Sequence, residues 1–313
     1  MEHVSWQRKG RNAFTLVELL VVISIIGVLA SIMLPAVNAA RDAARRTQCA
    51  SNMRQIGIGL LNFESAQGKF PEGQTWVSRT PPDDVAYSWA AHLLGYIEES
   101  SVADALDMQK SFLVPSNVVA ASKVIPIYIC PSTSDREEHR SLSDQLYNLE
   151  GLPGEGLACI DYLGISGPSP DSLNPATNEV YGSQRGILIG TKGLFRGDEL
   201  RVPPAVRTKH VTDGMTYTAC VTECTGRGLD GDGDYNGTWV SGKNIGHIAK
   251  GVNSSDSDKK WSKERIFSEH AGGALFLMCD GSVHFLTEST EKIILKAISS
   301  RNGAEGIENE IFN

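Results

Sequence analysis

The longest apolar segment of the chain lies near its start. Residues 14–34, FTLVELLVVISIIGVLASIML, carry a single charge, at Glu18. A helix of this length covers about 30 Å, which is the hydrocarbon thickness of a bilayer. The segment has no polar face, which disfavours a buried core helix, and no small-x-small cleavage site follows it, which disfavours a secretory signal peptide. The pattern therefore predicts a transmembrane helix over 14–34.

The helical pattern continues beyond Pro35, where we expect a kink because proline lacks a backbone N–H. Apolar residues then recur at spacings of three and four and predict one stripe of an amphipathic helix over 35–67. The stripe consists of Val37, Ala40, Ala44, Met53, Ile56, Leu60 and Phe63. Gly68 suits a left-handed C-cap and Pro71 prevents the helix from resuming. We expect one long helix whose second half packs on a domain formed by residues 68–313.

The pattern changes after Pro71 to short apolar runs separated by loops rich in Gly, Pro, Ser and Asp. The predicted elements are helices at 89–97 and 102–106, strands at 123–130, 187–189 and 218–222, loops at 131–156, 166–185 and 226–262, and a C-terminal helix at 291–299. Asp280-Gly281 separates two apolar runs, 274–279 and 282–286, which is a strong hairpin signal. The order of helices followed by strands predicts an α+β fold with an antiparallel sheet and long loops.

Composition and charge narrow the class of protein. The 313 residues are 41% hydrophobic and 21% charged, which excludes a disordered chain and a multi-span membrane protein. The net charge of −8 is divided unevenly, because residues 1–50 carry +3 and the remaining residues carry −11. Phosphate binding needs a concentrated basic face, so the acidic body argues against a nucleic-acid partner.

The N-terminal segment resembles the leader of type IV prepilins and type II secretion pseudopilins. The resemblance rests on residues 10–20, GRNAFTLVELL. It implies that a prepilin peptidase cuts between Ala13 and Phe14 and methylates the new amino group, leaving residues 1–13 as the leader. Ala13 departs from the family's usual Gly but remains small. The resemblance also implies that Glu18 pairs with the Phe amino terminus of a neighbouring subunit, which would neutralise a carboxylate that is costly in lipid.

The rest of the chain resembles a bacterial prepilin-like family of unknown function with a C-terminal His-x9-Asp-Gly motif. The motif corresponds to His270 and Asp280-Gly281, with nine residues between His270 and Asp280. Further segments that carry the resemblance, in chain order, are Leu60–Glu64, Phe70–Gly73, Ile129–Ser132, Val211–Gly214 and Glu223. This family likeness implies a pilin-like fold.

His270 and Asp280 have two interpretations. They are a candidate catalytic pair, but the chain offers no Gly-x-Ser-x-Gly elbow or similar nucleophile for them. In the structural interpretation, which we favour, Asp280 caps the hairpin turn and His270 lies at the tight entry to the first strand. The two residues would then clamp the base of the hairpin.

An acidic loop and six cysteines offer other chemistry. Asp230, Asp232 and Asp234 alternate with glycines, a spacing that lets carboxylates converge on Ca²⁺, although the EF-hand pattern is not met. A solvated acidic loop is the favoured alternative. Cys220 and Cys224 lack the spacing of a zinc knuckle. The even number of cysteines permits full disulfide pairing outside the cytoplasm, and burial as small hydrophobic residues explains them equally well.

These features predict a non-enzymatic, membrane-anchored pilin or pseudopilin-like protein that belongs to a filament, a secretion system or the cell surface. Its expected partners are prepilin peptidase, inner-membrane lipid and related subunits, with the globular domain outside the cytoplasm. The alternative is a tethered binding module for a saccharide or another substrate, with Trp239 and the 226–262 loop as its surface. A tethered hydrolase is disfavoured because a nucleophile and base are missing.

Overall fold

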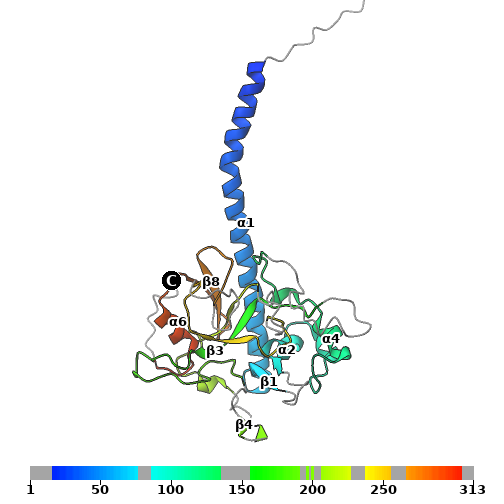
Figure 1. Cartoon of the computed structure of the whole chain (residues 1–313), viewed down its shortest axis with the longest axis vertical. Helices are drawn as coiled ribbons and strands as arrows, with labels where there is room; N and C mark the ends of the chain where they lie inside the picture. Colours follow the sequence, from blue (N-terminus) through cyan, green and yellow to red (C-terminus); the bar gives the residue numbers. More distant parts are fainter. Residues whose placement is uncertain are drawn as a thin grey trace, which may run out of the picture. The chain divides into compact units, whose positions relative to one another are not determined.

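The computed structural model describes residues 16–76, 86–134, 156–190, 206–226, 237–254 and 266–304, together with the backbone of two short strands at 195–196 and 199–200. The chain forms two compact units, residues 1–44 and 45–313. Helix α1 (Leu16–Gln67) belongs to both units (Figure 1). Residues 45–67 thus form part of the second unit, which we call the globular unit.

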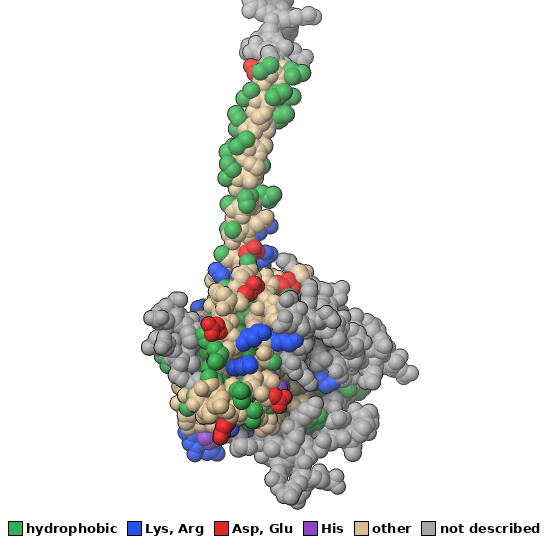
Figure 2. All heavy atoms as spheres, turned by 60° about the vertical axis from the view of Figure 1, so that its left-hand side comes forward, with side chains coloured by type: hydrophobic (Ala, Val, Ile, Leu, Met, Phe, Trp, Pro, Cys, Tyr) green, Lys and Arg blue, Asp and Glu red, His purple; other side chains and the backbone are tan. Residues whose placement is uncertain are grey.

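The first unit contains the apolar part of α1. The helix is long and apolar enough to cross a membrane, and it is the one such helix in the part of the chain that the structure describes. Its large apolar side chains from Leu16 to Leu34 are exposed, and Figure 2 shows them along the helix. Helical structure continues through Pro35. The expected single helix over both halves is confirmed.

The second half of α1 is a core element of the globular unit. Its buried residues are Cys49, Asn52, Met53, Ile56, Gly57, Gly59 and Leu60. The helix ends at Gln67, and Gly68 adopts φ +67°, where its N–H donates to the Glu64 carbonyl at 2.7 Å. This bond is the left-handed C-cap that the sequence predicts. Within the predicted stripe, Val37, Ala40 and Ala44 are exposed and belong to the first unit.

A five-stranded sheet forms the centre of the globular unit, with the strand order β7-β3-β6-β8-β9. The strands are β3 (Tyr162–Pro168), β6 (Ala219–Glu223), β7 (Ile245–Ile248), β8 (Gly273–Met278) and β9 (Val283–Thr287). Neighbours pair antiparallel except β3 and β7, which are parallel. The predicted α+β fold is confirmed, and the sheet is mixed because β7 adds to the edge of β3 instead of pairing with β6.

Two hydrophobic cores cover the two faces of this sheet. Leu275 and Leu277 of β8 join the core that contains the buried residues of α1. Phe276 and Met278 point to the other face and join the core of α6 (Lys292–Ser299). This alternation is the two-residue period of a strand that is covered on both sides.

Short helices and strands surround α1 and the sheet. They are β1 (Gln74–Trp76), β2 (Ala86–Ser88), α2 (Trp89–Leu93), η1 (Leu94–Tyr96), α3 (Ser100–Ala105), α4 (Pro115–Ala121), η2 (Pro126–Tyr128), β4 (Phe195–Arg196), β5 (Glu199–Leu200) and η3 (Thr208–His210). The predicted helices at 89–97, 102–106 and 291–299 are confirmed by α2 with η1, by α3 and by α6.

Four predictions for the body are wrong. One is the predicted loop at 226–262, which contains strand β7 because residues 245–248 pair with β3. Residues 123–130 contain the 3₁₀ helix η2 and no strand, because Pro126 has no N–H for a ladder and is well suited to a first helical turn. Residues 187–189 are buried but irregular, and only Gly190 forms an isolated bridge, with Gln74. Residues 166–168, predicted as loop, complete β3, whose Gly, Ser and Pro content conceals a strand.

The predicted hairpin is confirmed by β8 and β9. The Met278 N–H donates to the Ser282 carbonyl at 2.8 Å and closes the turn. Gly281 has φ +88°, a left-handed conformation that glycine adopts without steric cost. Asp280 Oδ1 accepts from the Ser282 N–H and hydroxyl, so the Asp-Gly pair forms the turn itself.

Candidate functional site

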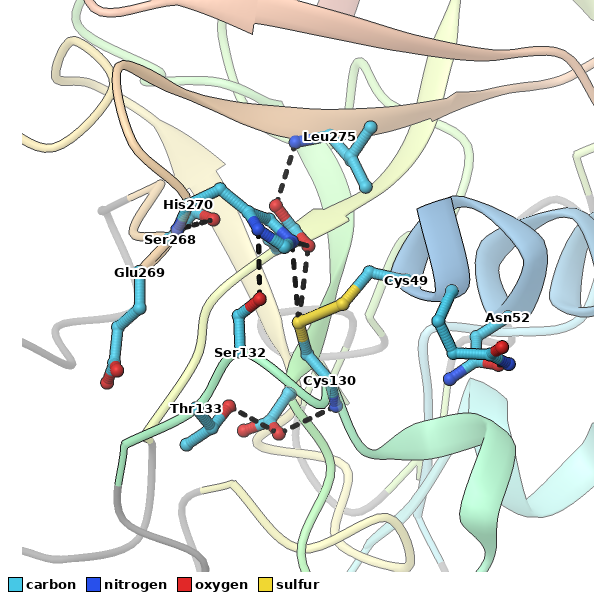
Figure 3. The surroundings of a disulfide bond; sticks show 12 residues. Cys49, Asn52, Cys130, Ser132, Thr133, Ser268, Glu269, His270 and Leu275 are labelled. Atoms are coloured by element: carbon cyan, nitrogen blue, oxygen red, sulfur yellow. Dashed lines mark hydrogen bonds and ion pairs between the residues drawn. A yellow bond between two sulfur atoms is a disulfide. The ribbon is translucent and has the colours of Figure 1, made fainter. Parts of the chain in front are cut away.

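A disulfide joins α1 to the segment that follows η2. Cys49 lies in the first turns of α1 within the globular unit, and Cys130 follows η2 by two residues (Figure 3). The two Cα atoms are 5.3 Å apart and both side chains are buried. The other four cysteines are buried and are not disulfide-bonded (Cys159, Cys220, Cys224 and Cys279). One pair is therefore bonded and four cysteines pack as small buried residues.

Glu223 and His270 lie against this disulfide. Glu223 is the last residue of β6, and His270 precedes β8, the strand next to β6. His270 Nε2 is 3.2 Å from Glu223 Oε1, and each of these atoms is 3.6 Å from Cys130 Sγ. Glu223 is fully buried and His270 is 5% exposed. Four segments of the fold thus bring two sulfurs, a carboxylate and an imidazole together.

Further hydrogen bonds hold these side chains in place. His270 Nδ1 lies 3.0 Å from the Ser132 hydroxyl, so the ring presents Nε2 to the carboxylate and the sulfur (Figure 3). Glu223 Oε2 accepts from the Leu275 N–H at 2.9 Å. Asp161 Oδ2 accepts from the Cys130 N–H at 3.0 Å and from the Thr133 hydroxyl at 2.9 Å. Each polar group around the disulfide is therefore oriented by a second partner.

Buried carboxylates around the disulfide also act on a neighbouring tyrosine. Burial, followed by the charges of Glu223 and Asp161, raises the pKa of Tyr162 well above its ordinary value. A buried carboxylate is costly without a partner, and Glu223 has both the His270 ring and the Leu275 N–H. We define the disulfide cluster as Cys49, Cys130, Glu223 and His270, whose four ligand-type atoms lie within 4.8 Å of one another.

His270 and Asp280 are not brought together. His270 precedes the first residue of β8 and Asp280 follows the last, so a strand of six residues, about 20 Å long, separates them. Asp280 is exposed and bonds within its own turn. The proposed clamp of His270 on Asp280 is wrong, because the motif marks both ends of one strand. At one end it contributes to the disulfide cluster, and at the other it forms the turn.

The remaining site residues predicted from the sequence lie outside the disulfide cluster or outside the described residues. Ala13 and Phe14 lie outside the described residues, as do Asp230, Asp232 and Asp234, so cleavage and calcium binding stay predictions. Glu18 lies in the first turn of α1 and is exposed. Trp239, named as part of a binding surface, is fully buried and donates from Nε1 to the Lys123 carbonyl at 2.9 Å. Its role is in the core.

The sequence did not predict that the residues of the disulfide cluster lie close together. Cys130, Ser132, Glu223 and His270 all occur in the segments that carry the family resemblance, yet nothing in their spacing places them together. The contacts join residues 93 and 140 positions apart. The one signal in the sequence was that each of these residues belongs to a short segment that carries the family resemblance.

Comparison with known proteins assigns the chain to a family. Residues 38–292, more than half of the chain, match the family described as "Protein of unknown function (DUF1559)". The chain belongs to this family. Within this DUF1559 protein, residues 8–34 also match the prokaryotic N-terminal methylation motif. The recognition of a prepilin-like chain is confirmed.

The curated relatives are fimbrial proteins. Two fimbrial proteins of Pseudomonas aeruginosa are each 35% identical to this chain over 79 residues, which is 25% of this chain and 47% of theirs. The chain spans about half the length of these relatives. No solved structure matches it. The DUF1559 protein is thus pilin-like in its N-terminal segment, and among its described residues it carries one apolar helix of membrane-spanning length.

Proposed function

We propose that this DUF1559 protein is a non-enzymatic pilin-like subunit. It is anchored in the inner membrane by residues 14–34 and is processed between Ala13 and Phe14 by a prepilin peptidase. The observation that carries the proposal is the methylation motif over residues 8–34, which includes the exposed apolar part of α1 from Leu16 to Leu34. An exposed run of large apolar side chains needs lipid or other subunits to cover it.

In this proposal, Glu18 is the residue of the membrane anchor that promotes assembly with neighbouring subunits. It is the single charge in the apolar segment, and a carboxylate at that depth costs roughly 2.5–3.5 kcal/mol without compensation. Processing at Phe14 creates an ammonium group four residues away along the chain. Pairing of Glu18 with this group on a neighbouring chain neutralises both charges and favours assembly.

The globular unit is placed outside the cytoplasm in this proposal. The Cys49–Cys130 disulfide supports that side, because disulfides form and persist in oxidising compartments and are rare in the cytosol. The basic segment Arg8–Arg11 precedes the apolar run and is compatible with a cytoplasmic leader. The protein then acts in a filament, a secretion system or at the cell surface.

A non-enzymatic role is supported by the site that the described residues form. The His270 ring is engaged at both nitrogens, by Ser132 and by Glu223, and it is almost fully buried. A general base must reach a substrate proton at hydrogen-bond distance. The surroundings of His270 instead serve to hold the disulfide.

Fractionation of cells that express the full chain tests the proposal. Sheared surface material and inner membranes are probed for wild type, Glu18→Ala and the control Asp42→Ala, which removes another exposed acidic residue of α1. We expect all three chains in the membrane. The sheared material should contain wild type and Asp42→Ala and should lack Glu18→Ala. Recovery of the wild-type chain in the soluble cytoplasm would contradict the proposal.

A further inference from the structure

The disulfide cluster has the composition and the geometry of a metal site as well as of a disulfide. Two cysteine sulfurs, one histidine nitrogen and one carboxylate oxygen form the ligand set of a four-coordinate zinc site. All four residues are buried and come from α1, the segment after η2, the end of β6 and the segment that precedes β8. We propose that these four residues form a two-state centre, a disulfide when oxidised and a tetrahedral Zn²⁺ site when reduced.

The distances support this inference. A tetrahedral Zn²⁺ with bonds of about 2.3 Å to sulfur and about 2.0–2.2 Å to nitrogen and oxygen separates N and O by about 3.4 Å, and S from N or O by about 3.5–3.6 Å. The corresponding distances are 3.2 Å for His270 Nε2 to Glu223 Oε1, and 3.6 Å for Cys130 Sγ to each of them. Three edges of the tetrahedron are therefore already formed.

The outer partners of the cluster are those that zinc ligands use. Metal-binding histidines ordinarily hydrogen-bond through their other ring nitrogen, which fixes the tautomer, and ligating carboxylates are hydrogen-bonded in turn. His270 Nδ1 has the Ser132 hydroxyl, and Glu223 Oε2 has the Leu275 N–H. Nε2 and Oε1 are left to face the sulfur.

The only large rearrangement is at the sulfurs. Bonded sulfurs lie about 2.05 Å apart, whereas two thiolates on one zinc lie about 3.8 Å apart. Rotation about the Cα–Cβ bonds of the two cysteines moves the sulfurs apart while the backbone of α1 stays in place. Cys49 lies on a rigid helix and Cys130 on a segment held by Asp161, so both remain near the other ligands.

The interconversion balances in electrons and protons. A dithiol reductant transfers two electrons and two protons to the Cys49–Cys130 bond and itself becomes a disulfide. Zinc then displaces the two thiol protons and binds two thiolates, the Glu223 carboxylate and neutral His270 Nε2. The site charge becomes −1, from three negative ligands and one divalent ion. A disulfide oxidant reverses the process and releases the zinc.

The test measures zinc and cobalt binding by the full chain in detergent. Wild-type protein is prepared oxidised, and also reduced with a phosphine and freed of metal. Zn²⁺ alone is added, and metal retained after dialysis is counted. We expect one zinc per reduced chain and none per oxidised chain. Co²⁺ should give the intense visible bands of a tetrahedral site and sulfur-to-cobalt charge transfer in the reduced chain only.

Variants separate this site from the other thiols. Cys220→Ala/Cys279→Ala removes a neighbouring pair of buried cysteines and should bind zinc like wild type. His270→Ala and Glu223→Gln should lose tetrahedral Co²⁺ bands. Ser132→Ala leaves all four ligands and should weaken zinc binding by about 10–100-fold, as removal of an outer-shell partner does, while Ser132→Thr should restore it.

Wild-type protein alone decides the outcome even if a variant fails to fold. A reduced wild-type chain that retains no zinc and gives no tetrahedral cobalt spectrum overturns the inference. So does zinc binding that is equal in oxidised and reduced chains, or that disappears in Cys220→Ala/Cys279→Ala.

Discussion

Two glycines, Gly57 and Gly281, lie where α1 contacts the β8–β9 hairpin. A Cβ added to Gly57 would lie 2.8 Å from Leu277 Cδ1 and 3.2 Å from the Cα of Gly281. Gly281 in turn has φ +88°. The glycine of the Asp-Gly motif therefore serves two purposes, since it permits the left-handed turn and lets the turn contact the helix.

We predict that Gly57→Ala lowers the free energy of unfolding of the globular unit by about 1–2 kcal/mol. Overpacking costs roughly 1–3 kcal/mol, and the gain in helix propensity returns at most about 1 kcal/mol. The control is Gly95→Ala, where a Cβ meets no atom within 4 Å. Chemical denaturation in mild detergent measures both. Equal stability of the two variants would refute this account of the helix–hairpin contact.

His92 makes the stability of the globular unit depend on pH. Burial, and secondly the charge of Lys69, lowers the pKa of His92 to about 4 from its ordinary 6.5. Because the unfolded chain takes up the proton first, stability is complete above pH 6.5 and falls as the pH drops towards 4. The loss is at most about 3 kcal/mol.

The variant His92→Gln should lack this part of the pH dependence. Its amide can still bond the Thr75 hydroxyl, which lies 2.8 Å from His92 Nε2 in the wild type. The measurement is the difference in unfolding free energy between the two proteins at pH 7 and at pH 4.5. Parallel curves across that range would show that the imidazole is not the titrating group.

The disulfide is the covalent connection between α1 and the outer segments of the globular unit. It joins residues separated by 81 positions, so it closes a long loop in the unfolded chain. Chain-entropy arguments give roughly 4–5 kcal/mol for such a loop, and measured values are typically about 2–4 kcal/mol. The Asp161 bonds to Cys130 and Thr133 keep the segment after η2 in position for the bond.

We predict that reduction in the presence of a metal chelator lowers the free energy of unfolding by about 2–4 kcal/mol. Cys49→Ala/Cys130→Ala should be insensitive to the reductant, while Cys220→Ala/Cys279→Ala should respond like wild type. Denaturant unfolding with and without a phosphine provides the comparison. If the two double variants responded alike, the Cys49–Cys130 bond would not be the stabilising one.

Elements with strong local signals were predictable from the sequence. The long helix with its Gly68 cap, the Asp-Gly hairpin and α6 all have periodicity or turn chemistry that local physics dictates. Strands β3 and β7 were missed because Gly, Ser and Pro in β3, and the brevity of β7, remove any period-two signal. Their strand state depends on long-range pairing with β6 and with each other.

The disulfide cluster required tertiary information. Cys49, Cys130, Glu223 and His270 are distributed over more than two hundred residues, and any of several cysteine pairings was compatible with the sequence. Burial of a Glu beside a His is unfavourable locally and follows only from the fold that pairs β6 with β8. Cys130, Glu223 and His270 lie in segments that carry the family resemblance, but their distances from one another could not be predicted from the sequence.

The molecule as a whole combines an N-terminal pilin-like segment with a globular unit built around a mixed sheet. The methylation motif ends at residue 34, and the DUF1559 match begins at residue 38, so the two matches meet within α1. The N-terminal segment provides anchoring and assembly in the proposed function. In the same proposal, the globular unit supplies the surface that an assembled protein would present.

Processing of the N-terminus tests the proposed function most directly. Mass spectrometry of the N-terminal peptide is carried out on the chain from cells with and without a prepilin peptidase. Loss of residues 1–13 removes Glu2, Arg8, Lys9 and Arg11 and changes the net charge from −8 to −10. We predict a mature chain that begins at N-methylated Phe14 when the peptidase is present, and an uncut chain when it is absent. A chain that begins at Met1 in both strains, or one cut after Ala39, would contradict the account.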